Sequence, residues 1–227
     1  MARKPLSRDP ELIAKWFATA SGFDFQYSHP LLRWLNEGTH ELANQWGAAA
    51  GPCLEIGSGS GHHSQLASAS RSEYVCLELQ PEYAAMTQRN APSASVVRGT
   101  AVELPFADRA FSRVVSISVF EHLRPLSRAV DEVLRVLRPG GDFVLALPAE
   151  GGFLYGLGRN LTTRRYHERQ WGIDYMHILR QEHVNTCSDV RRAVQTRLLR
   201  VRERHFPFRL PTVHLNAFYI GHFRRPA

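Results

Sequence analysis

Glycines at alternate positions follow a short apolar run in the stretch "CLEIGSGSGHH". Gly57, Gly59 and Gly61 come directly after residues 53–56, which have the length and character of a buried strand. A bare backbone at the end of a strand lets a ligand approach, and open parallel sheets bind ligands beyond the carboxyl ends of their strands. The third glycine of a dinucleotide fingerprint would stand at His62, and the lysine of a P-loop is missing. The spacing predicts a ligand site and disfavours NAD.

An acid ends the next strand-like run, "YVCLEL". This acid, Glu78, stands about twenty residues beyond the first strand, where an acid in such folds accepts hydrogen bonds from two ribose hydroxyls. The alternative is a solvated acid at a strand end. The position of Glu78 after "VCL" and before "QP" favours the ribose role.

Strand-like and helical segments alternate along the middle of the chain. Strands are predicted at 52–57, 74–79, 94–99, 111–118 and 142–148, and helices at 62–70, 81–90 and 126–141, the last stopped by Pro139 and Gly140. Amphipathic helices are predicted at 10–20 and 29–46, a further helix at 188–199, and a closing antiparallel pair at 200–208 and 214–223. The alternation predicts an α/β fold: a doubly wound, mostly parallel sheet with both faces covered.

Composition bounds the class of protein. The 227 residues are 44% hydrophobic, which suits one domain over 1–227 with one sizeable core. No window is apolar over eighteen residues and the N-terminus lacks a signal-peptide core, so we expect a cytoplasmic protein without a transmembrane segment. The three cysteines lack metal-site spacing, and we expect no metal.

The formal net charge is +7, and Lys4 and Lys15 are the only lysines. Arginine suits phosphate and carboxylate partners, although a genome bias toward arginine codons explains the composition equally well. An acidic substrate, a membrane surface or RNA could each use such a basic chain.

The stretch from about 50 to 150 resembles the class I S-adenosylmethionine-dependent methyltransferases, in particular the type 11 group. Four segments carry the resemblance: "LEIGSGSG", "LELQPEY", "GTAVELPFADRAFSRVVSISVFEHL" and "LRVLRPGGDFVLALP". The resemblance implies a Rossmann-like, seven-stranded sheet with a C-terminal antiparallel hairpin, and S-adenosyl-L-methionine as cofactor. The residues that it implies for cofactor binding are Glu55, Gly57, Ser58, Gly59, Gly61, Glu78, Leu79, Thr100, Ala101, Val102 and Ser116.

The implied roles differ along this set. Glu55 and the first two glycines would surround the methionine part, and Gly61 would allow close helix packing. Glu78 would hold the ribose, and Ser116 would face the methionine amino group. The family often has an acid where Thr100 stands, and a hydroxyl accepts from the adenine amino group more weakly.

A sulfonium methyl group is already activated, so the cofactor motif leaves the acceptor open. His122, in "VFEHL", is the candidate general base, because its imidazole titrates in the useful range. A structural role at a helix start is the alternative.

Residues 150–186 follow the fifth strand and are predicted to form a lid, and residues 1–48 are predicted to form a helical cap over the same cleft. The candidate substrate residues are Tyr27, Tyr155, Arg164, Arg165, Tyr175 and His177.

We therefore expect a methyltransferase acting on a small-molecule acceptor, with an anionic, sugar-linked or lipid-linked molecule suited to the lid arginines. An RNA methyltransferase is an alternative favoured by the charge, but no RNA-binding module is recognisable and "SISVFEHL" stands where an N-P-P-Y signature would be. A catalytically silent cofactor-binding protein is the third interpretation. The sequence leaves the oligomeric state open.

Overall fold

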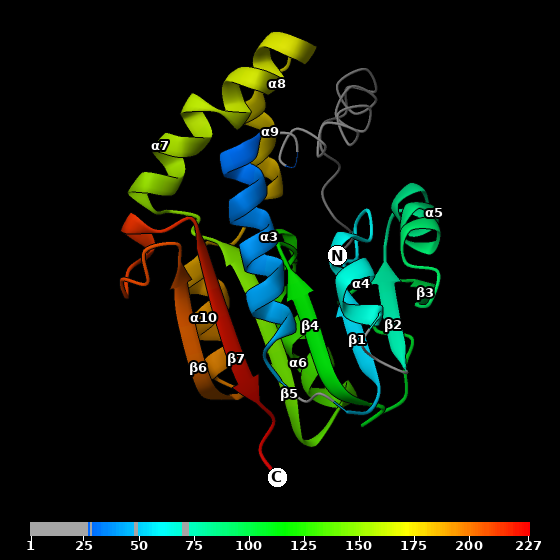
Figure 1. Cartoon of the computed structure of the whole chain (residues 1–227). Coiled ribbons are helices and arrows are strands. Elements are labelled where there is room, and N and C mark those ends of the chain that lie inside the picture. The colour runs from blue at the N-terminus through cyan, green and yellow to red at the C-terminus, as the bar shows by residue number, and fades with distance from the viewer. Residues whose placement is uncertain (1–26, 28, 48–49, 70–72) are drawn as a thin grey trace.

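A seven-stranded sheet forms the centre of the molecule, in the order β3-β2-β1-β4-β5-β7-β6 (Figure 1). The computed structural model describes residue 27 and residues 29–47, 50–69 and 73–227. The strands are β1 Cys53–Ile56, β2 Tyr74–Glu78, β3 Ser95–Arg98, β4 Phe111–Ile117, β5 Leu137–Pro148, β6 Leu199–Phe206 and β7 Phe218–Arg224. β7 runs antiparallel to β5 and β6, and the remaining pairs are parallel. The predicted mostly parallel sheet with an antiparallel C-terminal pair is confirmed.

Helices connect the strands and cover both faces of the sheet. They are α3 Pro30–Asn44, α4 His62–Ser68, α5 Pro81–Asn90, α6 Leu126–Val136, α7 Phe153–Leu161, α8 Thr163–Trp171, α9 Tyr175–Glu182 and α10 Cys187–Gln195, with short 3₁₀ turns η2 Phe120–His122 and η3 Val213–Leu215. The predicted helices at 29–46, 62–70, 81–90 and 188–199 all have a counterpart here. The predicted helix at 10–20 lies outside the described residues.

Strand side chains alternate between two hydrophobic cores. Leu54, Val114 and Phe143 point to the face covered by α6 and α10, whose Val133 and Val190 are fully buried. Cys53, Cys76, Val115 and Val144 point to the opposite face, which α3 and α4 cover with Ala43 and Ala67. Strands buried on both sides are continuous apolar runs, which explains why their sequences predict a parallel sheet.

The helix predicted at 126–141 is shorter than expected. α6 ends at Val136, and Leu137 already has the extended conformation, with ψ at 141°. Leu137 begins β5 and pairs with Phe111 of β4. Pro139 disfavours helical geometry in the residue before it, so the chain leaves the helix before the proline rather than at it.

A buried arginine joins α3 to the sheet. Arg113 lies on β4 and is fully buried. Its Nη2 donates to Ala43 O at 2.6 Å, and its Nε donates to Trp46 O at 3.0 Å. The cation therefore satisfies carbonyls at the C-terminal end of α3, where the helix dipole favours positive charge. This contact fixes the helix that walls one side of the site described below.

Residues 150–186 are more regular than their weak periodicity predicts. They form α7, α8 and α9, which stand above the carboxyl ends of the parallel strands (Figure 1). Asp174 caps α9 by accepting from His177 N at 2.9 Å. Among the described helices, none combines the length and apolar character needed to span a bilayer.

Candidate functional site

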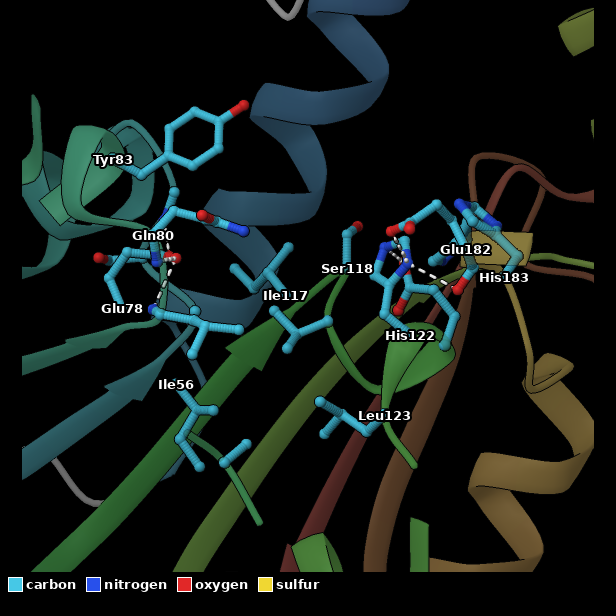
Figure 2. Close-up of a pocket in the computed structure, with 18 of the residues that line it drawn as sticks. Ile56, Glu78, Gln80, Tyr83, Ile117, Ser118, His122, Leu123, Glu182 and His183 are labelled. Carbon is cyan, nitrogen blue, oxygen red and sulfur yellow. Dashed lines mark hydrogen bonds and ion pairs between the residues drawn. The ribbon is translucent and has the colours of Figure 1, made fainter. Parts of the chain in front are cut away.

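A cavity of about 1000 Å³ lies beyond the carboxyl ends of β1, β2 and β4. Its walls are α3, the loop after β1, the end of β2, and residues 99–103, 117–125 and parts of α7 to α9. Figure 2 shows its two ends: Glu78, Gln80 and Tyr83 lie at one, and His122, Glu182 and His183 at the other. We call these the glycine-loop end and the helical end.

The loop after β1 has the left-handed backbone that its glycines predict. Gly59 has φ of +56°, and a Cβ placed there would meet no heavy atom within 4 Å, so the loop faces open space. Gly61 has φ of +84°, and a Cβ there would lie 2.9 Å from the Cα of Thr87 on α5. Gly59 thus leaves room for a ligand, whereas Gly61 is needed for close packing of the chain.

Glu78 is held by the backbone on both of its oxygens. Oε2 accepts from Gly59 N at 2.9 Å, and Oε1 accepts from Leu79 N at 2.8 Å and Gln80 N at 2.9 Å. The residue is 7% exposed and lines the cavity. A carboxylate offers about four lone-pair positions, so three bonds leave Oε2 able to accept one ligand hydroxyl without rearrangement.

An apolar slot lies beside Glu78. Leu79 is 48% exposed although it lines a cavity, and Ala101 and Val102 line the same end. Thr100 also lines it, and its hydroxyl accepts from Val102 N at 3.4 Å. An exposed apolar wall beside a fixed acceptor suits a flat ring attached to a polyol.

Two further predicted residues lie in the wall with their side chains turned inward to the protein. Ser58 lines the cavity, and its hydroxyl shares a hydrogen bond of 2.9 Å with Thr87. Glu55 is 2% exposed, and its Oε2 accepts from Ser64 at 2.6 Å and from Tyr74 at 2.9 Å. Burial raises the pKa of Glu55 to about 7. Gly57 lines the cavity as well.

Ser116 is a correction. It is fully buried, and its hydroxyl donates to Ile56 O at 3.0 Å, so it faces the neighbouring strand rather than a ligand. Ile117 and Ser118 line the cavity in its place, and both are labelled in Figure 2. Ser118 has φ of +54°, so the chain turns sharply after the strand. The predicted strand at 111–118 and β4 end within one residue of each other, so Ser116 lies inside the strand rather than beyond it.

The helical end gathers carboxylates and imidazoles from segments far apart in the sequence. Glu121 and His122 come from η2, Glu182 from α9, and His183 follows α9. The rings of His122 and His183 meet edge to face with centroids 4.7 Å apart. His122 Nε2 lies 3.8 Å from Glu121 Oε1.

A hydrogen bond fixes the tautomer of His122. Its Nδ1 lies 3.0 Å from Glu182 O. A carbonyl only accepts, so Nδ1 carries the proton and Nε2 of the neutral ring is the atom that can take one. His122, with a side chain 26% exposed, therefore presents a basic nitrogen at the cavity.

Behind this end, Glu150 forms an ion-paired network. Arg159 Nη1 donates to both oxygens of Glu150, at 2.7 and 2.8 Å, and His183 Nδ1 lies 2.9 Å from its Oε2. Burial opposes the charge, yet the hydrogen bonds from His183 and Arg159 hold the pKa of Glu150 below its usual range.

Three of the predicted substrate residues line the cavity and three do not. Tyr27, Tyr155 and Tyr175 are part of its wall. Arg164 pairs with Glu168 at 2.8 Å, and Arg165 lines a separate, smaller hollow of about 460 Å³. His177 hydrogen-bonds with Gln181 at 2.9 Å on the exposed side of α9. These placements are corrections, because weak periodicity left the inward faces of α8 and α9 undetermined.

Sequence reasoning missed an imidazole cluster that joins α3 to α4. His40 stacks on His63 with centroids 5.4 Å apart and lies 4.9 Å from His62, and its Nε2 is 3.2 Å from the Tyr27 hydroxyl. Burial, with the nearby charge of His62, lowers the pKa of His40 to about 3, so this ring is neutral. The adjacent histidines of "GHH" directly after the glycine loop were the available signal.

Comparison with known proteins identifies the surrounding domain. Residues 54–145 match the model of the family described as "Methyltransferase domain". A probable S-adenosylmethionine-dependent methyltransferase of Mycolicibacterium smegmatis is 30% identical over 117 residues, 52% of this chain and 45% of the relative. An uncharacterized methyltransferase of Mycolicibacterium vanbaalenii is 35% identical over 118 residues, 49% of this chain and 46% of the relative. The chain thus spans about half the length of these curated relatives.

The fold also matches solved structures. The N-methyltransferase NodS from Bradyrhizobium japonicum, in complex with S-adenosyl-L-homocysteine, superposes with a TM-score of 0.62 at 18% identity, over 88% of this chain and 89% of NodS. At this identity the likeness shows the fold alone. Residues 54–145 therefore match a methyltransferase domain, and the curated relatives of this chain are described as S-adenosylmethionine-dependent or uncharacterized methyltransferases.

Proposed function

We propose that the protein is an S-adenosylmethionine-dependent methyltransferase whose acceptor is a small molecule. The observation that carries the proposal is the pairing of Glu78 with Gly59 in the wall of the cavity. A carboxylate fixed by three backbone donors stands beside a glycine whose missing side chain leaves open space.

The glycine-loop end fits the cofactor. Glu78 would accept from a ribose hydroxyl, and Leu79, Ala101 and Val102 would pack on the adenine ring. Ser118, rather than Ser116, would lie toward the methionine part. When bound, S-adenosyl-L-methionine supplies an activated methyl group, so the protein needs only to align the acceptor and exclude water.

The helical end fits an acceptor-binding role. Nε2 of His122 can take a proton from an acceptor hydroxyl or amine, because Nδ1 is committed to Glu182 O. Tyr155, Tyr175 and Leu179 line this end from α7 and α9 and would shield the reacting atoms from water. The base role of His122 remains a prediction.

A small molecule fits better than RNA. The candidate acceptor residues Tyr155 and Tyr175 lie in the cavity wall, and Tyr175 and Glu121 are buried. A nucleic acid would need cations at the mouth, yet the predicted Arg164 is paired with Glu168. The features that favour the RNA interpretation are the net charge of the chain and, among the described residues, Arg124 and Arg128 in the cavity wall.

A transfer assay tests the proposal. The full chain is incubated with S-adenosyl-L-methionine labelled in its methyl group and with either a fractionated metabolite extract or total RNA. We expect label in a small-molecule fraction and none in RNA, with the signal lost in Glu78→Ala. Label in RNA alone would support the alternative function, and no transfer despite cofactor binding would favour a catalytically silent protein.

A further inference from the structure

We propose that the protein docks on a membrane surface containing anionic lipids, through one face of α7 and the connection between β6 and β7. This inference concerns a surface outside the cavity, so it goes beyond the proposed function and does not depend on it. We call the docking region the apolar surface. Its side chains are each at least 37% exposed: Phe153, Leu154, Leu157 and Leu161 on α7, and Phe208, Leu210 and Leu215 on the connection.

The first observation is that α7 turns its apolar face outward. Its four apolar side chains stand at positions i, i+1, i+4 and i+8, so they share one face of the helix. Phe153, the first of them, is 70% exposed. The other face points to the protein, where Tyr155 lines the cavity and Arg159 binds Glu150. A helix on a protein surface ordinarily buries its apolar face, so the orientation of α7 indicates that a partner covers this face.

The second observation is that the β6–β7 connection holds its apolar side chains outward. Residues 208–211 are all exposed. Asn216 is fully buried beneath them, and its Oδ1 accepts from Phe208 N at 2.9 Å. Its Nδ2 donates to Leu210 O at 2.9 Å and to Thr212 O at 2.8 Å. Because this buried amide fixes the turn, the exposure of Phe208 and Leu210 is part of the folded structure.

The two parts of the apolar surface are neighbours. Gly152, directly before α7, packs on η3, since a Cβ placed on this glycine would collide with Val213 O. Figure 1 shows the β6–β7 connection directly below the start of α7, at the same side of the molecule. Monomeric proteins rarely expose large contiguous apolar patches, and such patches mark interaction sites.

Positive charge accompanies the apolar surface. Residues 151–167 and 207–218 contain no aspartate or glutamate. Arg209 stands in the exposed turn of the connection, and the exposed Arg165 and Arg169 line the smaller hollow at the C-terminal end of α7. Apolar side chains flanked by cations complement a bilayer with anionic headgroups. This charge complementarity favours a lipid surface as the occupant.

The length of α7 determines how it would dock. Its nine residues are too few to cross the hydrocarbon core of a bilayer, so the helix would lie in the interface with its apolar face inserted. Tyr155, on its other face, lines the helical end of the cavity. Docking would therefore place this end of the cavity beside the lipid.

Vesicle flotation of the full chain tests the proposal. The probes are vesicles of phosphatidylcholine alone and vesicles that also contain phosphatidylglycerol, which is anionic. We expect the chain to bind the anionic vesicles at least about tenfold more tightly than the neutral ones. Added NaCl should weaken the binding to anionic vesicles, because salt screens the arginines.

Variants assign the binding to the apolar surface. Leu157→Gln should weaken binding to anionic vesicles at least about fivefold, because an inserted side chain is lost. Its matched control is Leu66→Gln on α4, since both leucines are 43% exposed, and this control should stay within about twofold. Arg209→Gln should weaken the same binding about fivefold and leave neutral vesicles unaffected, whereas Arg138→Gln at the start of β5 should change neither.

Thermal unfolding and sedimentation velocity identify other occupants. If no vesicles are bound, a lowered melting temperature in Leu157→Gln would mean that another part of this chain covers the surface. A dimer that this variant dissociates would then mean that a second copy covers it. An absence of vesicle binding with neither effect would point to a different protein as the partner. Each of these three results would overturn the proposal.

Two results with bound vesicles would also overturn it. If Leu66→Gln weakens binding as much as Leu157→Gln, the lipid contacts the chain elsewhere. If neutral and anionic vesicles bind equally, the arginines do not select the surface.

Discussion

At the scale of single residues, Glu78 has a structural role in the loop and a proposed role in ligand binding, and its position in the sequence predicts only the second. It shapes the loop through three backbone bonds, and it keeps lone-pair capacity for a ligand. The sequence predicted the second duty from the strand end. It could not predict the first, because a hydrogen bond from Gly59 N depends on the left-handed turn of the loop.

Glu78→Gln should therefore weaken binding of S-adenosyl-L-homocysteine by about 1–3 kcal/mol. The amide nitrogen would face a backbone donor, and the loop would lose its shape. Calorimetry measures the change, with the exposed Glu82→Gln on α5 as control. An affinity within twofold of the unmodified chain would mean that Glu78 does not contact the ligand.

Glu121 predicts how stability depends on pH. Burial raises its pKa to about 7 in the folded chain, from 4.5 in a solvated carboxyl. A raised carboxyl pKa means that its contribution is fully present below pH 4.5 and is lost as pH rises toward 7. The unfolding free energy of the cofactor-free chain, relative to Glu121→Gln, should fall by about 3 kcal/mol across this range.

Urea unfolding of both proteins between pH 4 and 8 measures this difference. Glu82→Gln serves again as the control for effects of the substitution type. A difference between the unmodified chain and Glu121→Gln that stays constant with pH would show that Glu121 ionises freely in the folded protein.

At the scale of elements, two glycines of the loop after β1 have different roles: Gly59 borders the open space of the cavity, and Gly61 packs against α5. Gly59→Ala should preserve the fold at a cost of about 1 kcal/mol for its positive φ, and it should abolish binding of the cofactor product, because the methyl group enters the open space. Gly61→Ala should instead lower the melting temperature strongly, because its methyl group meets the backbone of α5.

Thermal unfolding and calorimetry on the same two variants check this contrast. The pair controls itself, since both substitutions add one methyl group at a left-handed glycine two residues apart. Full affinity in a folded Gly59→Ala variant would show that the loop is only a turn.

The hydrogen bonds from Arg113 to the C-terminal end of α3 attach this helix to the sheet. Arg113→Met should destabilise the fold by about 3 kcal/mol or more, because the carbonyls of Ala43 and Trp46 would lose buried donors. Chemical unfolding measures the loss, with Arg138→Met as an exposed control. Unchanged stability would mean that water replaces the guanidinium.

The positions of most helices and strands could be predicted from the sequence. Which side of each helix faces the cavity was harder to predict. Apolar runs and residues typical of helix ends, such as Pro81 at the start of α5, predicted the strands and helices through β5. The helices of residues 150–186 have mixed polarity, so spacing could not say which of their arginines face the cavity. The structure pairs Arg159 with Glu150 and turns Arg164 and Arg165 away from the cavity.

At the scale of the whole molecule, the net charge of +7 gave no guide to the site. Arginines serve structure in several places, as when Arg135 binds Glu132 and Asp108, and Arg202 lies 4.5 Å from the ring of Trp46. The helical end of the cavity brings together Glu121, Glu182, His122 and His183 instead. The net charge adds up all charged side chains of the protein, whereas ligand recognition depends on the few charged groups that line the cavity.

The most direct test of the account is a calorimetric titration of the full chain with S-adenosyl-L-homocysteine, S-adenosyl-L-methionine and NAD. The account predicts micromolar binding of both sulfur compounds at one site per chain, and none of NAD, because the loop lacks the third glycine of a dinucleotide fingerprint. Binding of NAD without a response to either sulfur compound would contradict the central claim.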